Sequence, residues 1–192
     1  EKIRNAVNPF DKKSRNLVSA GRLHYQKGFD LLLRAFEKAI HRDPRLRLTL
    51  VGDGTERQRL ARLAERLKVE DRVVFAGHRD NPFPYMHYAD LFISSSRWEG
   101  SPNTVLESLA CGTPVLAFDC PGGTGEILKE GENGWLIPKG DWEGLGQKIT
   151  EVIDGKRSLT RPLLPEKYRI ENVVTLWESL FANLTKSGAK KH

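Results

Sequence analysis

Cysteine is scarce in this chain, and its scarcity argues against a small protein stabilised by zinc or by disulfide bonds. Only Cys111 and Cys120 are present among the 192 residues. They form no Cys-x-x-Cys pair and no cluster with histidine, so the sequence predicts neither a zinc site nor a disulfide framework. Structural disulfides are rare in the reducing cytoplasm. We therefore expect a cytoplasmic protein, with Cys111 packed at the end of a helix.

Long apolar runs are absent as well. No stretch of the sequence approaches the roughly eighteen consecutive apolar residues that a membrane-spanning helix requires. The hydrophobic fraction of 39% and the charged fraction of 29% are ordinary for an α/β domain. A chain of 192 residues can bury a substantial core, so we expect one domain or one half of a larger enzyme.

The excess of positive charge is modest. Lysine and arginine contribute 31 residues and aspartate and glutamate 25, which gives a net charge of +6. The two signs are mixed along predicted helices, as in segments 56–59 and 65–68, and this is typical of a solvated helix face. No basic and aromatic platform for nucleic acid is recognisable. We expect no nucleic-acid partner and, at most, peripheral association with the anionic inner face of a membrane.

Short apolar segments alternate with amphipathic ones along the chain. The segments with strand character are residues 17–20, 46–51, 73–75, 90–94, 115–118 and 134–137. The segments with helical character are residues 29–40, 55–68, 84–88, 102–112, a short helix after 122–123, 141–154 and 170–184. Strands that alternate with helices are joined by right-handed crossovers. The sequence therefore predicts an α/β fold, a Rossmann-like doubly wound parallel sheet of about six strands with helices on both faces.

The helix expected from residue 102 has a favourable start. Ser101 is a good N-cap residue, and Pro102 suits the first helical position because its missing N–H would have no partner there. The next three residues would then have free amides: Asn103, Thr104 and Val105. Unpaired amides and the partial positive charge of a helix start attract anions. We expect a group such as a diphosphate at this end.

Two glutamates flank this helix start. Glu99 precedes it, and Glu107 lies inside the helix about a turn and a half from its beginning. A carboxylate accepts hydrogen bonds from hydroxyls but repels phosphate. Along the chain, a carboxylate is followed by free amides and then by a second carboxylate. This order suits a ligand made of a sugar, a diphosphate and a ribose. A glutamate pair at this spacing also occurs by chance, and the strand end, turn and helix start around it favour the functional interpretation.

A basic loop points to the same ligand. Arg22 and Lys27 lie between the strand segment 17–20 and the helical segment 29–40. Open α/β sheets bind ligands at such carboxyl ends of strands. Arginine offers a bidentate fork and lysine a point charge, a common pairing for a diphosphate. For either residue alone, the alternative to diphosphate binding is that it belongs to an ordinary solvated loop.

The order of these motifs resembles a known family. Gly-Arg-Leu-x-x-x-Lys-Gly at 21–28, followed by Glu-x7-Glu at 99–107, is similar to the C-terminal, donor-binding half of a GT-B-fold retaining glycosyltransferase of glycosyltransferase family 4. Segments 52–54 and 73–77 fall between the two motifs as they do in that family. The resemblance implies one half of a GT-B fold. It also implies transfer of a hexosyl unit from a nucleotide-diphosphate sugar to a glycan or lipid-linked acceptor.

The resemblance implies roles for the charged residues. Arg22 and Lys27 would hold the donor diphosphate together with the amides of residues 103–105. Glu107 would bind the ribose hydroxyls, and Glu99 would face the donor sugar. A departing diphosphate carries negative charge, which cations and helix amides stabilise in the transition state. The catalytic residues implied are Glu99, Arg22 and Lys27.

Further positions are implied around the nucleotide. His78 and Arg79 would neighbour the base, and Gly52 would let the backbone approach the ligand, unless it serves only an ordinary turn. The loop with Gly122, Gly123 and Glu126 would lie near the sugar, although glycines at a helix start need no ligand. The chain contains no Asp-x-Asp motif, so a metal-bound diphosphate is not indicated and we expect metal-independent donor binding.

Several alternatives stay open from the sequence. UDP and GDP are both acceptable nucleotides, and Glu99 could attack the sugar or position it, with the resemblance favouring same-face attack and a positioning role. Two other hypotheses are a nucleotide-sugar enzyme of the same fold with other chemistry, such as an epimerase or phosphorylase, and a non-catalytic nucleotide-binding module.

The resemblance also divides the chain. Residues 1–11 would be a hinge segment from a missing N-terminal domain, and residues 12–169 the donor-binding domain. Residues 161–165 interrupt the pattern, 170–185 would form a helix that returns to the missing domain, and 186–192 would be a disordered tail. The acceptor would bind through the missing domain, so we expect these residues alone to bind the donor without transferring its sugar.

Overall fold

Six parallel strands form the centre of the computed structural model, which describes residue 3 and residues 6–11, 13–155 and 164–188. The strands are β1 (Arg15–Ala20), β2 (Leu46–Val51), β3 (Val73–Gly77), β4 (Leu91–Ser94), β5 (Val115–Asp119) and β6 (Gly134–Pro138). Their order in the sheet is β3-β2-β1-β4-β5-β6, and every neighbouring pair is parallel. The predicted doubly wound, Rossmann-like sheet is confirmed.

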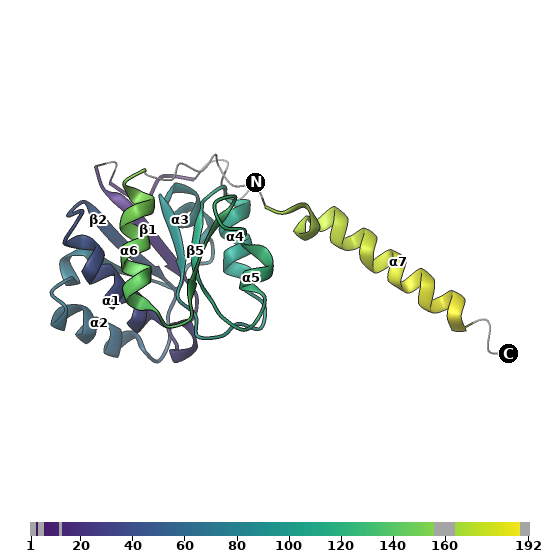
Figure 1. Cartoon of the computed structure of the whole chain (residues 1–192), viewed down its shortest axis with the longest axis horizontal. Helices are drawn as coiled ribbons and strands as arrows, with labels where there is room; N and C mark the ends of the chain where they lie inside the picture. The colour runs from purple at the N-terminus through teal and green to yellow at the C-terminus, as the bar shows by residue number, and fades with distance from the viewer. Residues whose placement is uncertain (1–2, 4–5, 12, 156–163, 189–192) are drawn as a thin grey trace.

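Helices cover both faces of this sheet (Figure 1). The helices on one face share the larger core: α1 (Phe29–Ile40), α2 (Arg57–Arg66) and α6 (Trp142–Ile153). The helices on the other face share the smaller core: α3 (Phe83–Tyr88), α4 (Asn103–Ala110) and α5 (Thr124–Ile127). Three 3-10 turns occupy Tyr25–Lys27, Glu70–Arg72 and Glu166–Tyr168, and α7 (Ile170–Gly188) ends the described chain.

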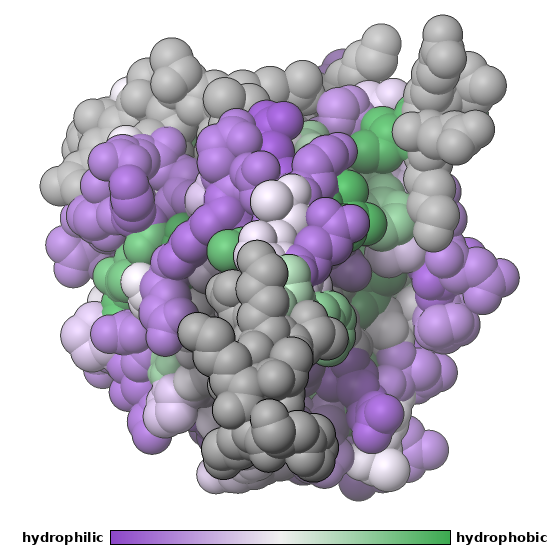
Figure 2. All heavy atoms as spheres, turned by 90° about the vertical axis from the view of Figure 1, so that its right-hand side faces the viewer, coloured by the Kyte–Doolittle hydropathy of each residue, from purple (hydrophilic) through white to green (hydrophobic). Residues whose placement is uncertain are grey.

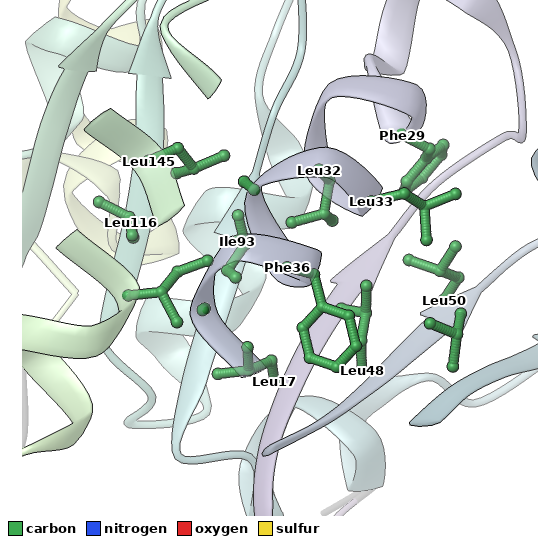
Figure 3. Close-up of a cluster of buried hydrophobic side chains, with 14 of the residues drawn as sticks. Leu17, Phe29, Leu32, Leu33, Phe36, Leu48, Leu50, Ile93, Leu116 and Leu145 are labelled. Atoms are coloured by element: carbon green, nitrogen blue, oxygen red, sulfur yellow. The ribbon is translucent and has the colours of Figure 1, made fainter. Parts of the chain in front are cut away.

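Strand β1 contributes to both cores because successive residues of a strand point to opposite faces. Leu17 packs in the larger core and Val18 in the smaller one. The apolar stripe of α1 lies on the larger core, and Figure 3 shows Phe36 beside Leu48 of β2. Burying one such side chain contributes about 1.5–3 kcal/mol. These contacts fix the sheet from which the loops of the site project.

The order of the strands reverses between β1 and β4, which lie side by side with Leu17 opposite Leu91 and Val18 opposite Phe92. From β1 the chain continues to β2 and β3 at one edge of the sheet, and from β4 it continues to β5 and β6 at the other edge. A crevice therefore opens at the carboxyl ends of these two strands, where doubly wound folds bind ligands. The loops after β1 and β4 are the ones that carry Lys27 and Glu99.

The predicted start of α4 is wrong by one residue. Pro102 occupies the N-cap position instead of Ser101, and the helix begins at Asn103. The Ser101 hydroxyl donates a hydrogen bond of 2.8 Å to the Asn103 side-chain oxygen, so it makes no cap to the helix amides. Other element ends differ by one to two residues, as for α2, whose expected range 55–68 shortens to Arg57–Arg66.

Helix α7 points away from the sheet (Figure 1) and carries large exposed side chains. Among them Trp177 stacks on Phe181, with ring centroids 5.7 Å apart. The helix runs to Gly188, four residues past its expected end at residue 184. Residues 189–192 and most of the expected break at 161–165 lie outside the described residues. The segment predicted to be a hinge contacts α3 where it is described: the Tyr88 hydroxyl donates to the Ala6 carbonyl at 2.9 Å.

On the face seen in Figure 2, hydrophilic residues dominate and hydrophobic ones form separate patches. No helix within the described ranges has the length and apolar character needed to cross a membrane.

Candidate functional site

The loops after β1 and β4 are joined by reciprocal hydrogen bonds. The Arg97 amide donates to the Gln26 carbonyl at 2.7 Å, and the Gln26 side chain donates to the Trp98 carbonyl at 3.0 Å. The Ser95 hydroxyl donates to the Lys27 carbonyl at 3.0 Å. Two segments far apart in the sequence therefore form one rigid rim at the switch point of the sheet.

Arg97 anchors this rim to the first turn of α1. Its guanidinium makes two hydrogen bonds to the carboxylate of Asp30, at 2.9 and 2.8 Å, and another to the Tyr25 carbonyl at 2.7 Å. Burial alone would raise the pKa of Asp30, but the hydrogen bonds and charge of Arg97 outweigh it and hold that pKa below its ordinary value. The hydrogen bonds with Asp30 raise the pKa of Arg97. The pair is therefore charged at neutral pH.

Arg97 and Asp30 were not among the site residues predicted from the sequence. They lie 67 positions apart, and no local motif pairs them. The available signal was weak: an arginine two residues before Glu99 and an aspartate at the start of a helix, where negative charge is favourable.

Lys27 and Glu99 meet at the centre of the crevice. The Lys27 ammonium lies 2.7 and 3.0 Å from the two carboxylate oxygens of Glu99, and the Ser96 hydroxyl donates to Oε1. Only 4% of the Glu99 side chain is exposed, against 20% for Lys27. Removing the cation would leave a buried carboxylate without a partner, which is strongly destabilising. The structure thus brings together two residues that the motifs placed in separate loops.

The loop after β5 closes behind Glu99. The Glu99 amide donates to the Pro121 carbonyl at 2.8 Å. Gly122 has a φ of +113°, and a Cβ there would lie 1.8 Å from the Glu99 carbonyl oxygen. Only glycine fits this approach. At Gly123 a Cβ would meet nothing within 4 Å, so this loop contacts Glu99 through one glycine and not the other.

A cavity of about 320 Å³ opens at the switch point, at the carboxyl ends of β1, β2 and β3. Six of the predicted site residues line it: Arg22, Gly52, His78, Arg79, Thr104 and Glu107. They come from the loops after β1, β2 and β3 and from the first turns of α4. Their side chains supply two cations, a carboxylate, a hydroxyl and an imidazole, and Gly52 supplies backbone groups. Such a mixture suits an anionic ligand that also carries hydroxyls.

Gly52 has its own structural explanation. Its φ is +137°, and a Cβ there would lie 1.9 Å from the Gly21 carbonyl oxygen. The two loops that carry Arg22 and Asp53 can approach each other only because position 52 lacks a side chain. The turn therefore accounts for this glycine without a ligand.

The helix start offers fewer free amides than predicted. The Asn103 amide donates to the Ser101 carbonyl at 2.9 Å, and the Val105 amide donates to the Pro102 carbonyl at 3.0 Å. For Thr104, no hydrogen bond of the amide is found among the described residues. Thr104 also lines a narrow recess beside Lys27, so it borders both halves of the site. The expectation of three free amides is wrong for Asn103 and Val105, whose carbonyl partners lie in the turn before α4.

Three of the predicted positions lie at the margin of the site. His78 is 79% exposed and lies 3.4 Å from Asp80, and Arg79 lies over the Tyr85 ring. The backbone oxygen of Glu126 accepts a hydrogen bond from Lys167. None of these three residues contacts the Lys27–Glu99 pair in the described structure.

The two thiols are buried rather than reactive. Cys111 follows α4, as predicted, and burial together with the charge of Glu107 raises its pKa to about 11. Burial also raises the pKa of Cys120. Thiols with raised pKa values are poor nucleophiles. Within the described ranges, no group of three or more histidine, cysteine or acidic residues is arranged to hold a metal ion.

A larger hollow of about 670 Å³ lies between the end of α4 and the segment leading into α7. Its lining is mainly apolar, and it includes Leu109, Leu164 and Ile170. None of the predicted site residues borders it. The smaller, charged cavity at the switch point is therefore the better candidate for a ligand site.

The doubly wound sheet and the charged crevice at its switch point define a Rossmann-like ligand-binding domain. Residues 1–165 match the model of the family described as glycosyl transferases group 1. The chain belongs to this family.

Curated relatives agree with this assignment. The chain is 38% identical over 145 residues to the lipopolysaccharide core biosynthesis glycosyltransferase LpsE of Rhizobium meliloti, covering 76% of this chain and 41% of LpsE. It is 29% identical over 173 residues to an uncharacterised glycosyltransferase of Haemophilus influenzae, covering 88% of this chain and 49% of that protein. The chain thus spans less than half the length of each of these relatives.

Solved structures show the same fold. HepE of Anabaena, in complex with UDP-glucose, has 30% identity and a TM-score of 0.68, over 75% of this chain and 40% of HepE. The pneumococcal O-GlcNAc transferase GtfA, in complex with UDP and GlcNAc, has 27% identity and a TM-score of 0.70, over 76% of this chain and 30% of GtfA. TarM of Staphylococcus aureus, at 24% identity, has a TM-score of 0.81 and supports the fold alone. The fold is that of one Rossmann-like half of a GT-B glycosyltransferase.

Proposed function

We propose that this chain is the nucleotide-sugar-binding half of a retaining glycosyltransferase of family 4. The enzyme would transfer a hexosyl unit from a UDP-sugar to a glycan or lipid-linked acceptor. The observation that carries the proposal is the cavity with Arg22, Thr104 and Glu107, where Thr104 also lines the recess beside Lys27, the partner of Glu99. HepE and GtfA, which share the fold, were solved with UDP or a UDP-sugar, and this favours UDP over GDP.

In this proposal the cavity binds the nucleoside and the diphosphate. Glu107 accepts hydrogen bonds from the ribose hydroxyls, and Arg22 binds the diphosphate through its guanidinium fork. The Thr104 amide, and with it the positive end of α4 formed by residues 103–105, faces the same group. His78 and Arg79 neighbour the base. Each hydrogen bond to a charged group contributes about 1.5–3 kcal/mol.

Lys27 occupies the junction between donor phosphate and donor sugar. In the chemical step the bond between the anomeric carbon and the phosphate oxygen breaks, and the diphosphate leaves with the electron pair. Lys27 and Arg22 stabilise the charge that develops on the leaving group. The acceptor hydroxyl attacks from the same face and transfers its proton to the departing phosphate oxygen, so the configuration is retained.

Glu99 acts as a positioning group in this scheme. Both of its carboxylate oxygens accept hydrogen bonds, from Lys27 and Ser96. A carboxylate held in this way is a poor nucleophile but a well-ordered acceptor for sugar hydroxyls. Donor binding needs no metal ion, because cationic side chains neutralise the diphosphate.

The acceptor side belongs to a domain that these residues do not include. We assign residues 1–11 to the hinge that enters the donor-binding domain, and the helix at 170–185 to the return toward the N-terminal domain. The exposed apolar side chains of α7 and the greater length of the relatives support this division. The chain alone would bind the donor in the cytoplasm, with peripheral attraction to the membrane, and would not transfer sugar.

Calorimetric titration of the chain with UDP and with GDP, with and without EDTA, tests the proposal. We expect metal-independent binding of UDP, and a loss of affinity of roughly tenfold or more in Glu107→Ala, because two charge-assisted hydrogen bonds to the ribose disappear. Glu65→Ala, at an exposed position on α2, is the matched control and should bind UDP normally. An unchanged affinity in Glu107→Ala would contradict the proposed binding mode.

A further inference from the structure

Two exposed aromatic rings form a pair at the rim of the crevice. Tyr25 is 51% exposed and Trp98 is 44% exposed, and their ring centroids lie 6.1 Å apart at an interplanar angle of 56°. Among the described residues, the other large aromatic side chains with comparable exposure are on α7. Rings of this size are normally buried, and an exposed pair beside a site marks a surface that a ligand or partner covers.

The pair is held in place without a ligand. The Arg97 guanidinium lies over the Tyr25 ring at 3.9 Å and is itself fixed by Asp30. The Trp98 carbonyl accepts the hydrogen bond from the Gln26 side chain, which ties the two loops together beneath the rings. A surface ordered in advance loses less conformational entropy on binding. The rings therefore form a rigid platform.

The position of the platform distinguishes it from the nucleotide cavity. Tyr25 lies in the same 3-10 turn as Lys27, and Trp98 directly precedes Glu99. Neither ring lines the cavity with Arg22 and Glu107. Thr104 lines both this cavity and the recess beside Lys27, and the two rings belong to the same two loops as the Lys27–Glu99 pair. In the proposed function, the group beyond the donor sugar at this point is the acceptor.

We propose that Tyr25 and Trp98 form a stacking platform for a pyranose ring of a glycan acceptor, an inference that rests on the proposed function above. A pyranose presents an apolar face of C–H groups and a rim of hydroxyls. Tyrosine and tryptophan match it, because each combines a large flat apolar ring with one polar atom. Both have few rotatable bonds, so stacking costs little side-chain entropy. The platform would be the contribution of the donor-binding half to an acceptor that otherwise binds through the domain these residues do not include.

Indole resonances of the chain labelled with nitrogen-15 test this inference. The chain has four tryptophans, and Trp98→Phe identifies the Trp98 signal. The probes are methyl α-glucoside and methyl N-acetyl-α-glucosaminide, added in the presence of saturating UDP. We expect both the Trp98 signal to shift and Tyr25→Ala to weaken saccharide binding by roughly three- to tenfold, the effect of losing one aromatic contact. Phe181→Ala, at an exposed ring on α7, is the control and should change nothing.

The outcomes separate the two proposals. Normal UDP affinity in Tyr25→Ala and Trp98→Phe, together with weaker saccharide binding in Tyr25→Ala, supports the platform and shows that the variant is folded. Normal UDP binding with no shift of the Trp98 signal, or with an equal shift at Trp177, overturns the platform and leaves the proposed function standing. Failure of the unmodified chain to bind UDP overturns both.

Discussion

At the residue scale, Lys27 is the most constrained side chain of the site. It neutralises Glu99, whose side chain is almost fully buried, while one fifth of its own surface faces solvent. A buried carboxylate that loses its cation costs several kcal/mol. In the proposed function, a donor diphosphate must bind to Lys27 without withdrawing it from Glu99, so Lys27 would contact both groups at once.

Asp30 allows a prediction about pH. Asp30→Asn removes the charge that pairs with Arg97, so we expect a loss in unfolding free energy of roughly 1–2 kcal/mol at neutral pH. The folded-state pKa of Asp30 lies below its ordinary value of 3.8. Its contribution is therefore fully present above the unfolded pKa and disappears as the pH falls through the folded pKa. Urea denaturation of both proteins between neutral pH and strongly acidic pH measures this.

The control for this prediction is Asp71→Asn, at an exposed position in the turn before β3. It should differ little from the parent chain at any pH. A loss in Asp30→Asn that stays constant into the acid range would show that the charge on Asp30 does not stabilise the rim.

At the element scale, sequence patterns predicted the strands and α1 well because each depends on local information. The helix over 29–40 has an apolar stripe at helical spacing, and its bounds agree with the prediction. The start of α4 was missed because the Ser101 hydroxyl bonds to a neighbouring side chain instead of the helix amides. The Lys27–Glu99 contact joins positions 72 apart, so only the strand order β1–β4 reveals it. Local motifs indicated these residues as candidates, whereas their pairing could not be read from any local motif.

The loop after β5 gives a test with a built-in control. Gly122→Ala would place a Cβ against the Glu99 carbonyl oxygen, whereas Gly123→Ala meets nothing within 4 Å. Both glycines have positive φ, so both variants carry backbone strain of about 1–2 kcal/mol. Gly122→Ala carries in addition a steric clash of about 1–3 kcal/mol. We expect urea denaturation to show the larger loss for Gly122→Ala. Equal losses would mean that the close approach to Glu99 does not constrain the loop.

At the scale of the whole molecule, the described chain combines a covered sheet with one helix whose apolar side chains are exposed. The sheet has helices on both faces, yet α7 leaves it with large apolar side chains exposed, among them Leu176, Trp177 and Phe181. Burying such side chains is favourable by about 1.5–3 kcal/mol each, so a free α7 is a strong candidate for a contact with further protein. The two relatives described above are each more than twice as long as the matched segment. We propose that the chain nevertheless holds a complete donor site.

A crystal structure of the chain with UDP tests that claim most directly. We predict that UDP binds in the cavity at the switch point, with its ribose hydroxyls hydrogen-bonded to Glu107 and its diphosphate between Arg22 and Lys27. We predict no metal ion on the phosphates. UDP bound elsewhere, for instance in the hollow between α4 and α7, would contradict it. So would UDP in the cavity with its ribose directed away from Glu107.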